Sequence, residues 1–377
     1  LSSYNRDEWE TVTLGDVASE YSRRIDNPSE SAYDYFIGSD CIGQYDFRIH
    51  KRSSAKGVTS AQKLFCSGDY LLVRRSLYGS DFRERAPRAD FNGVCSADIL
   101  TIRENPEKIV SGFLIYVLYS KALWDFIVSN SNGGLTRRIK WKQLATFEFN
   151  LPPKNIQKEI ADKLWAAYEL KEAYKKMIAA TDEMVKSQFI EMFNDSPLVR
   201  LEDHIETQSG GTPNTKKSEY YDGGTIPWLS SGEVNQGYIS STEKYITEEG
   251  LENSAAKWVP KNSVVIAMYG ATAGKVGFIT IPLTTNQAVC ALLPNDAFNP
   301  LYLYYAVLSQ KNWMIAQCRG AAQPNISQGI IRSMEIPMPS LSEQMQFVNI
   351  IKQADKSKFE LRQAIDKIDK VMKSLLQ

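Results

Sequence analysis

Residues 270–277, GATAGKVG, combine glycines with a lysine in the manner of a loop that wraps the phosphates of a nucleotide. Such a P-loop has four residues between its glycines and a Ser or Thr after the lysine, whose hydroxyl binds Mg²⁺. Here three residues separate Gly270 from Gly274, and Val276 follows Lys275. Both requirements fail, so the sequence argues against an ATPase, and the role of this segment must come from the rest of the chain.

Other catalytic arrangements are also poorly supported. The chain has two histidines, His50 and His204, and five cysteines without a C-x-x-C pair, so neither a zinc site nor a Ser-His-Asp or Cys-His arrangement is expected. The segment NLPPK at 150–154 partly matches the N-P-P-aromatic motif of amino-methyltransferases, but Leu151 interrupts it and Lys154 replaces the aromatic ring. We therefore expect no catalytic residues, no metal and no cofactor.

The composition is that of an ordinary globular protein of two or three domains. The 377 residues are 43% hydrophobic and 23% charged, and 44 Lys and Arg balance 44 Asp and Glu. A net charge of zero argues against a chain that binds polyanions over its whole surface, but it allows local basic patches. The cysteines are interpreted as reduced thiols, and the sequence shows neither a signal peptide nor a membrane-length apolar run, which predicts a cytoplasmic protein.

The sequence contains an internal repeat. Matching residues recur in the same order and at a nearly constant separation. This separation changes by a few residues within each copy and then returns to its starting value. Insertions and deletions in the loops of two copies of one fold produce this pattern. The matched pairs include Leu14 and Leu201, Asp16 and Asp203, Ser39 and Ser231, Tyr78-Gly79 and Tyr269-Gly270, Ala97 and Ala288, Trp124 and Trp313, Ile139 and Ile326, Pro152 and Pro339, and Gln157 and Gln344.

Each copy begins with a mixed region of strands and turns, at about residues 10–150 and 198–337, in which one helix is also plausible. The helices are suggested by apolar residues that recur at helical spacing. The predicted strands lie within 70–79 and 263–270, the loops or tight turns at 220–228 and 231–239, and the helices at 111–127 and 299–318.

Each copy ends with one long helix. Proline is tolerated at the start of a helix but not inside it, so the helices are expected to begin just after Pro152-Pro153 and just after Pro339. Their apolar residues recur in steps of three and four, which indicates one seam per helix, and two such helices most simply pack on each other. The seam residues are Ile156, Ile160, Leu164, Ala167, Leu170, Tyr174, Met177, Thr181, Met184 and Gln188 in the first helix, and Phe347, Ile350, Ala354, Leu361, Ile365, Ile368, Met372 and Leu375 in the second.

Basic residues concentrate in corresponding regions of the two copies. Ten basic residues and three acids lie between Arg48 and Arg88, and residues 255–335 contain six basic residues and two acids. Arg and Lys position a phosphate backbone, while Arg, Asn and Gln can read base edges, so we predict that both copies bind nucleic acid. The residues expected to contact DNA are Arg48, Lys51, Arg52, Lys56, Arg74, Arg75, Tyr78, Arg83, Arg85, Arg88, Arg137, Arg138 and Lys140 in the first copy, and Thr212, Lys216, Lys217, Ser230, Ser231, Tyr269, Thr272, Lys275, Asn286, Gln287, Gln323, Asn325 and Gln328 in the second.

Three segments of the second copy, at 209–234, 264–294 and 325–348, resemble a target-recognition domain of the specificity (S) subunits of Type I restriction-modification systems. They carry G-A-T-x-G-K-x-G, T-N-Q-A and the helix entry P-x-P-x-L-x-E-Q in the expected order. The first copy is similar more loosely: it keeps Tyr78-Gly79 and the Pro152-Pro153…Gln157 entry but lacks GATAGKVG. Such divergence is expected of domains that read different DNA half-sites.

This resemblance implies an α+β fold of two mixed α/β target-recognition domains, separated by two long antiparallel coiled-coil helices in an internal pseudo-twofold repeat. It places the domains at 1–153 and 197–339 and the helices at 154–196 and 340–377. It also implies a subunit without catalytic activity that reads a bipartite, asymmetric site on double-stranded DNA and docks two methyltransferase (M) subunits and further restriction (R) subunits. GATAGKVG would then be a glycine-rich turn that allows close approach of its backbone either to DNA or to a neighbouring strand.

Two alternatives remain open at this stage. A nucleotide-binding or methyl-transferring enzyme would bind ATP or S-adenosylmethionine tightly as the isolated chain. A coiled-coil scaffold that binds only proteins would show no salt-dependent binding to duplex DNA when it is assembled with M subunits.

Overall fold

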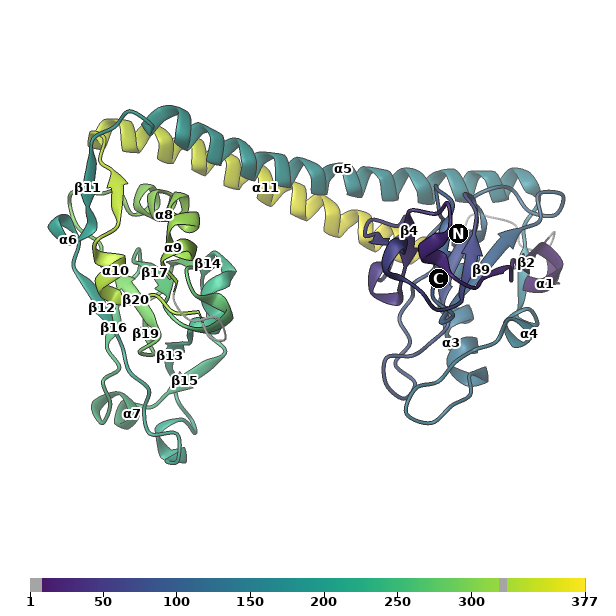
Figure 1. Cartoon of the computed structure of the whole chain (residues 1–377), viewed down its shortest axis with the longest axis horizontal. Coiled ribbons are helices and arrows are strands. Elements are labelled where there is room, and N and C mark those ends of the chain that lie inside the picture. The colour runs from purple at the N-terminus through teal and green to yellow at the C-terminus, as the bar shows by residue number, and fades with distance from the viewer. Residues whose placement is uncertain (1–8, 319–323, 377) are drawn as a thin grey trace. The chain divides into compact units, whose positions relative to one another are not determined.

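The computed structural model describes residues 9–318 and 324–376, which form two compact units. The first unit contains Leu1–Lys176 and Leu361–Gln377, and the second contains Met177–Glu360. Each unit therefore holds one mixed region and one end of each of two long helices (Figure 1). In the described part of the chain, no helix combines the length and the apolar character needed to cross a membrane.

The first unit contains three sheets. Five strands follow the order β3-β6-β8-β4-β5, three follow β2-β9-β7, and β1 pairs with β10. The bounds are β1 Glu10–Thr13, β2 Ala18–Glu20, β3 Arg24–Ile25, β4 Tyr35–Ile37, β5 Ser53–Ser54, β6 Gln62–Phe65, β7 Tyr70–Val73, β8 Gly93–Cys95, β9 Ile99–Glu104 and β10 Glu148–Leu151.

The second unit also contains three sheets. Their orders are β12-β20-β17-β18-β14, β15-β13-β19-β16 and β11-β21. The bounds are β11 Leu198–Arg200, β12 Thr207–Ser209, β13 Ile226–Leu229, β14 Tyr238–Ile239, β15 Lys244–Ile246, β16 Trp258–Val259, β17 Val264–Ala267, β18 Val276–Ile279, β19 Leu283–Thr285, β20 Val289–Leu292 and β21 Glu335–Pro337.

Corresponding strands pair in the same way in the two units, which confirms the internal repeat. The parallel pair β4–β8 matches the parallel pair β13–β19, and the antiparallel pair β7–β9 matches β17–β20. The second unit differs by an added hairpin, in which β18 pairs with β17 across GATAGKVG. In the first unit the chain after β7 runs as a loop to β8. The first copy therefore forms no corresponding hairpin turn, which explains why it lacks the glycine-rich sequence.

Shorter helices complete both units, and they correct two of the predictions. Each single helix expected at 111–127 and 299–318 is in fact two helices. Ser120 breaks the first with an extended backbone (ψ 140°), and its hydroxyl accepts a hydrogen bond from the N–H of Leu123 to start the next helix. The loops expected at 220–228 and 231–239 were wrong at their ends, because residues 226–228 belong to β13 and residues 238–239 to β14. The bounds are α1 Leu14–Val17, α2 Leu114–Leu118, α3 Lys121–Asn130, α4 Trp141–Leu144, α6 Leu201–His204, α7 Glu248–Glu252, α8 Pro300–Ser309, α9 Lys311–Gln317 and α10 Gln328–Arg332.

The two long helices, α5 (Lys154–Phe193) and α11 (Leu341–Leu376), begin just after the expected prolines. Each unit contains one ion pair between them: Lys171 Nζ lies 2.6 Å from Asp369 Oδ1 in the first unit, and Lys358 Nζ lies 2.8 Å from Asp182 Oδ1 in the second. A later position on α5 thus meets an earlier position on α11, which confirms the antiparallel direction. The internal repeat places Lys171 at the position of Lys358 and Asp182 at that of Asp369.

The predicted seam of α5 was wrong at three positions beyond Leu164, whereas Ala167 packs against the core of the first unit. Leu170, Met177 and Met184 are 44%, 52% and 47% exposed. The buried face passes instead through Tyr168, Lys171, Val185, Phe189 and Phe193. The prediction failed because charged residues such as Lys171 and Asp182 occupy seam positions, where their ion pairs with α11 replace apolar contacts.

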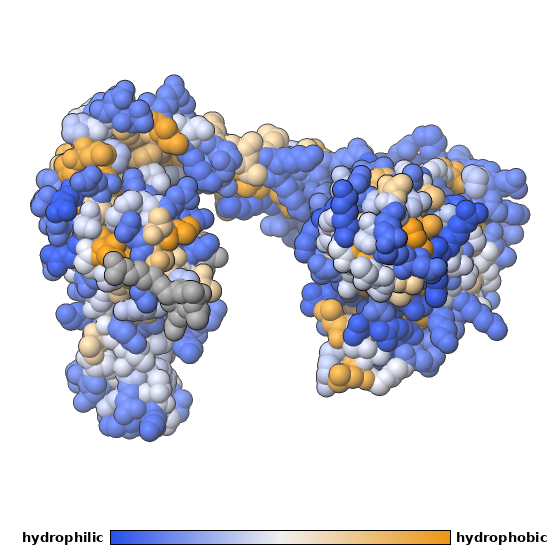
Figure 2. Space-filling view, viewed as in Figure 1, coloured by the Kyte–Doolittle hydropathy of each residue, from blue (hydrophilic) through white to orange (hydrophobic). Residues whose placement is uncertain are grey.

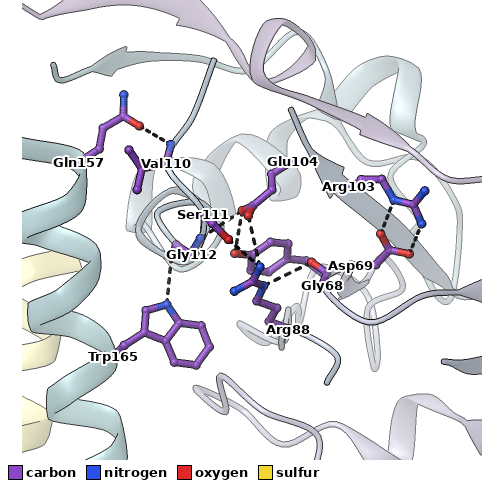
Figure 3. A network of polar contacts seen from close by, with 11 residues as sticks. Gly68, Asp69, Arg88, Arg103, Glu104, Val110, Ser111, Gly112, Gln157 and Trp165 are labelled. Carbon is purple, nitrogen blue, oxygen red and sulfur yellow. Dashed lines mark hydrogen bonds and ion pairs between the residues drawn. The ribbon is translucent and has the colours of Figure 1, made fainter. Parts of the chain in front are cut away.

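Polar contacts fix the mixed region of the first unit to α5 (Figure 3). The side chain of Gln157 accepts from the N–H of Val110 at 2.8 Å, and Nε1 of Trp165 donates to the Gly112 carbonyl at 3.1 Å. Beside them, the Glu104 carboxylate accepts from the hydroxyl of Tyr70 at 3.0 Å. These bonds satisfy groups that the packing of helix against domain would otherwise leave without water or a partner.

Candidate nucleic-acid interface

The carboxyl ends of the parallel strands β4 and β8 lie side by side in the first unit. The register pairs Ile37 with Cys95, and the N–H of Ser96 donates to the Ile37 carbonyl at 3.0 Å. Loops that follow parallel neighbours emerge at one edge of a sheet, a common position for binding sites. Asp98 lies in the loop that follows β8, and its side chain contacts Arg75, which follows β7, and Arg138, which precedes α4. We call these three residues the first edge cluster.

Asp98 is the centre of the first edge cluster. Its carboxylate accepts from Nη1 of Arg75 at 3.1 Å and from Nε of Arg138 at 2.7 Å. Burial raises the pKa of the Asp98 carboxyl, but the hydrogen bonds from Arg138 and Arg75 outweigh burial and hold the pKa below its ordinary value. Two guanidinium groups share one carboxylate, so the cluster keeps a positive charge and a fixed geometry.

The second unit has a corresponding edge at the ends of β13 and β19. Leu229 pairs with Thr285, and the N–H of Asn286 donates to the Leu229 carbonyl at 3.1 Å. Beyond these strands, the Thr212 hydroxyl donates to Oε1 of Gln287 at 2.5 Å. We call Thr212, Asn286 and Gln287 the second edge cluster. Its groups are amides and a hydroxyl, whereas the first edge cluster is built from guanidinium and carboxylate groups.

The segment GATAGKVG forms the tight connection between β17 and β18. Gly270 and Gly274 both have φ of 77°, a conformation that glycine adopts without strain. Their N–H groups donate to the carbonyls of Pro324 and Ala267, and the N–H of Lys275 donates to Thr272. These donors are therefore occupied and do not form a phosphate cradle. A Cβ on Gly274 would meet Met314 Cβ of α9 at 3.4 Å, so the backbone there approaches a helix of its own unit.

An exposed tyrosine follows the corresponding strands β7 and β17. Tyr78 is 70% exposed and Tyr269 is 43% exposed. The next residue in the first unit, Gly79, donates its N–H to the Leu135 carbonyl at 2.9 Å, while Tyr269 forms a bridge with Asn325. Both tyrosines thus stand on loops that are held by a second, later segment of the chain.

Most of the other basic residues predicted in the first unit have partners within the protein. Nη2 of Arg88 donates to the Ser111 hydroxyl at 2.8 Å and pairs with Glu104 at 3.4 Å (Figure 3). Arg85 is 8% exposed and donates to the Ser39 carbonyl at 2.9 Å. The remaining contacts are Arg48 with Glu169 and Trp165, Lys51 with Asp40, Arg52 with Asp90 and Phe91, and Arg137 with the Ser131 carbonyl.

Three predicted residues of the first unit, Lys56, Arg83 and Lys140, have exposed side chains, and their charged groups form no ion pair within the described ranges. Arg74 is half-buried, and its Nε atom has no hydrogen-bond partner in the part of the chain that the structure describes. The exposed side chains of Lys56, Arg83 and Lys140 remain available to a ligand.

The other predicted residues of the second unit lie at several places. Lys216 and Asn325 are exposed, Thr272, Lys275 and Ser231 are half-buried, and Gln323 lies outside the described residues. The remaining contacts are Lys217 with the Tyr220 hydroxyl, Ser230 with the Glu233 carboxylate, and Gln328 with the Thr207 hydroxyl.

One further group of possible metal ligands lies in the first unit. Ligand atoms of Asp46, His50 and Glu172 fall within 4.8 Å of one another. Lys175 Nζ already lies 2.8 Å from the Glu172 carboxylate, and the His50 ring shares a hydrogen bond of 2.8 Å with the Tyr168 hydroxyl. Burial raises the pKa of the Asp46 carboxyl, which lowers its value as a ligand. These contacts explain the proximity of the three residues without a metal ion: they form a polar network that links a loop to α5.

Asp98 was missed in the sequence, although it organises the first edge cluster. The sequence feature that could have identified Asp98 is its position immediately after Ala97, which the repeat matches with Ala288. Asp98 lies outside the stretch from Arg48 to Arg88 whose charges were counted, and its role appears only in its contacts with Arg75 and Arg138.

Two related domains, each with polar side chains near the ends of parallel strands and with one end of a helix pair, define a protein built by internal duplication. The chain belongs to the family described as Type I restriction modification DNA specificity domain, which matches residues 6–179 and 195–370.

Individual relatives agree with this assignment. The chain is 32% identical over 151 residues to the Type I restriction enzyme EcoR124I/EcoR124II specificity subunit of Escherichia coli, covering 39% of this chain and 37% of that protein. It is 20% identical to the HindI specificity subunit of Haemophilus influenzae, covering 88% and 90%. The match spans only about two fifths of the length of the first curated relatives, at 37%, 38% and 41%.

Solved structures show the same fold. The Type I restriction-modification S subunit from M. genitalium aligns with a TM-score of 0.56 at 16% identity, covering 100% of this chain and 97% of that chain. A chain from a study of complex assembly in the type I R-M system aligns with a TM-score of 0.61 at 17% identity, covering 98% and 97%.

Proposed function

We propose that this chain is the DNA sequence-recognition subunit of a Type I restriction-modification assembly, in which each unit reads one half of a bipartite, asymmetric double-stranded site. The observation that carries the proposal is the pair of edge clusters. The β8–β9 loop places Asp98 between two guanidinium groups in the first unit, and the corresponding β19–β20 loop presents the amides of Asn286 and Gln287, beside the Thr212 hydroxyl, in the second. One backbone frame with two sets of base-reading groups suits two different half-sites.

Within this proposal, side chains divide into two roles. Arg75 and Arg138 in the first unit, and Asn286 and Gln287 in the second, are placed to read base edges. Exposed cations such as Arg83, Lys56 and Lys140, and Lys216 in the second unit, are suited to phosphate contacts that add affinity without reading sequence. The exposed rings of Tyr78 and Tyr269 add contact area beside the base-reading residues of the first and second units, respectively.

The chain itself supplies no chemistry in this proposal, so M and R subunits must provide methylation and cleavage. Exposed apolar side chains on α5, with Leu170 in the first unit and Met184 in the second, supply surface that suits M subunits. We propose two M subunits per chain, because the repeat offers related surfaces in both units. A cytoplasmic location follows from this role, since the target is intracellular DNA.

The proposal is tested by duplex binding of the purified M–S assembly. We expect specific binding to the methylated motif, with an affinity that falls steeply between about 50 and 200 mM salt. An intact assembly that shows no salt-dependent duplex binding would support the protein-only scaffold instead. Tight binding of ATP or S-adenosylmethionine to the isolated chain would support the enzyme alternative.

A further inference from the structure

The strand pairs β1–β10 and β11–β21 allow a residue-by-residue comparison of the two units. Thr13 pairs with Glu148 and Thr11 with Asn150 in the first unit, while Arg200 pairs with Glu335 and Leu198 with Pro337 in the second. The registers are the same, so the residue two places before Thr11 corresponds to the residue two places before Leu198. These residues are Trp9 and Ser196.

In the first unit, Trp9 packs against the apolar core as a partly buried side chain. With Tyr116, Ser120 and Leu376 it lines a pocket of about 220 Å³. The indole therefore occupies the space between the start of β1, the α2–α3 junction and the end of α11.

In the second unit, the small Ser196 stands at this position, between Asn194 and Leu198, and both of these residues line a larger corresponding pocket. It has a volume of about 620 Å³ and lies between the end of α5, β11 and the α8–α9 junction. Its walls include Phe189, Tyr305 and Ser309, the repeat counterparts of Leu376, Tyr116 and Ser120. The two pockets are thus built alike, and the larger one lacks an indole.

The rim of the larger pocket is apolar and exposed. Ile190 is 61% exposed and Leu198 is 60% exposed, and both line the pocket. The space-filling view shows hydrophobic surface on this unit around the end of α5 and β11 (Figure 2). Lys311 adds an exposed positive charge at the same rim.

We propose that this pocket receives an aromatic side chain, flanked by a carboxylate, from a methyltransferase subunit. Trp9 shows which kind of group the frame accepts, and Lys311 supplies the complement to an acidic neighbour. Aromatic anchors that enter a preformed apolar pocket are the usual centres of binding energy at protein interfaces. Since Trp9 lines the other pocket, the second unit alone offers this contact among the residues that the structure describes, and the two M positions differ. This inference rests on the proposed function for the identity of the partner.

The first test uses 5-fluoroindole as a probe and the full chain, observed by ¹⁹F NMR. We expect the probe signal to broaden with the unchanged chain and with the control Ser196→Ala, but not with Ser196→Trp, in which a new indole fills the pocket. The thermal unfolding midpoint of Ser196→Trp is expected to be unchanged or raised, because the variant reproduces the arrangement around Trp9. Equal broadening with all three proteins would overturn the pocket assignment, whatever the partner.

The second test measures binding of the purified methyltransferase subunit to the same proteins. We expect Ser196→Trp to weaken this binding by about tenfold or more, the loss that follows removal of one interface anchor. Lys311→Glu, on the exposed rim, should weaken it without affecting the fold. Unchanged affinity of both variants would refute the partner assignment, as would a loss of self-association in Ser196→Trp without any effect on the methyltransferase subunit. If even the unchanged chain fails to bind the subunit, the proposed function fails, while the probe result still decides the pocket.

Discussion

Gln157 and Gln344 make equivalent hydrogen bonds at the starts of α5 and α11. Gln157 accepts from the N–H of Val110 and donates to the Pro152 carbonyl, both at 2.8 Å. Gln344 accepts from the N–H of Asn299 at 2.8 Å and donates to the Pro339 carbonyl at 3.1 Å. Both side chains are buried. Each glutamine thus joins the first turn of a long helix to the mixed region of its own unit.

Removal of either glutamine side chain should destabilise the unit that contains it. In Gln344→Ala, the part-buried N–H of Asn299 and the carbonyls of Ala297 and Pro339 lose a partner, which costs about 1–3 kcal/mol. Gln157→Ala should cause a similar loss in the first unit. Denaturant unfolding measures both, and Gln346→Ala, at an exposed position of the same helix, is the control. A loss no larger than that of the control would contradict the structural role.

The ion pair between Lys171 and Asp369 should show strong coupling in a double-mutant cycle. Lys171→Asp places two carboxylates together at a buried position, so we expect a loss of about 1–3 kcal/mol in the free energy of unfolding. Adding Asp369→Lys should restore most of it. Lys176→Asp, at an exposed position of α5, is the matched control. Additive effects of the two charge reversals would show that these residues do not pair.

The sequence predicted the architecture well because repeats and prolines leave local signals. Both long helices start where Pro153 and Pro339 place them, and the repeated strands pair alike. The seam of α5 was wrong at Leu170, Met177 and Met184, because Lys171 and Asp182 are seam residues whose role depends on partners far along the chain. Apolar periodicity does not register charged residues. A seam that contains ion-paired residues can therefore be recognised only when the position of the partner helix α11 is known.

The predicted DNA contacts remain a prediction, because charge counting does not separate exposed cations from buried ones. It could not distinguish Arg83, which is exposed, from Arg85, which is buried against the Ser39 carbonyl. Two positions apart, these residues have the same chemistry and different surroundings. Tertiary contacts decide whether such a cation is exposed or buried. These contacts join segments that are distant in sequence, such as β7 and residues 131–139.

Arg83 and Arg85 should therefore respond differently to replacement by alanine. Loss of an exposed phosphate contact at Arg83 should weaken binding to all duplexes alike and reduce the salt slope by about one, without an effect on stability. Arg85→Ala should lower the free energy of unfolding, because its buried guanidinium supports the loop that contains Ser39. Salt titrations and denaturant unfolding distinguish the two. Equal effects of both variants on stability would contradict the assignment.

Asp98 should make the stability of the first unit depend on pH. Burial raises the pKa of its carboxyl, but hydrogen bonds from Arg138 and Arg75 lower it overall, so the folded-state pKa lies below the unfolded value. The stabilisation is present above the unfolded pKa and is lost as the pH falls through the folded pKa. The difference in unfolding free energy between the wild type and Asp98→Asn should hold at neutral pH and shrink below about pH 4. A difference that does not vary with pH would argue against the pair.

Gln287 should read one position of the half-site assigned to the second unit. Its amide is oriented by the Thr212 hydroxyl, as a bidentate contact to a base requires. Gln287→Ala should cost about 1–3 kcal/mol for the cognate duplex and relax the preference at one base pair. Competition binding with duplexes substituted at each position measures this. Uniform weakening at every position would instead assign Gln287 to the phosphate backbone.

Independent reading of two half-sites is the central claim, and genome-wide methylation sequencing tests it most directly. Residues 10–150 are replaced by the matching domain of a relative, and the chimaera is expressed with its methyltransferase subunit. The account predicts that one half of the methylated motif changes to that of the relative while the other half is retained. A simultaneous change in both halves, or an unchanged motif, would contradict it.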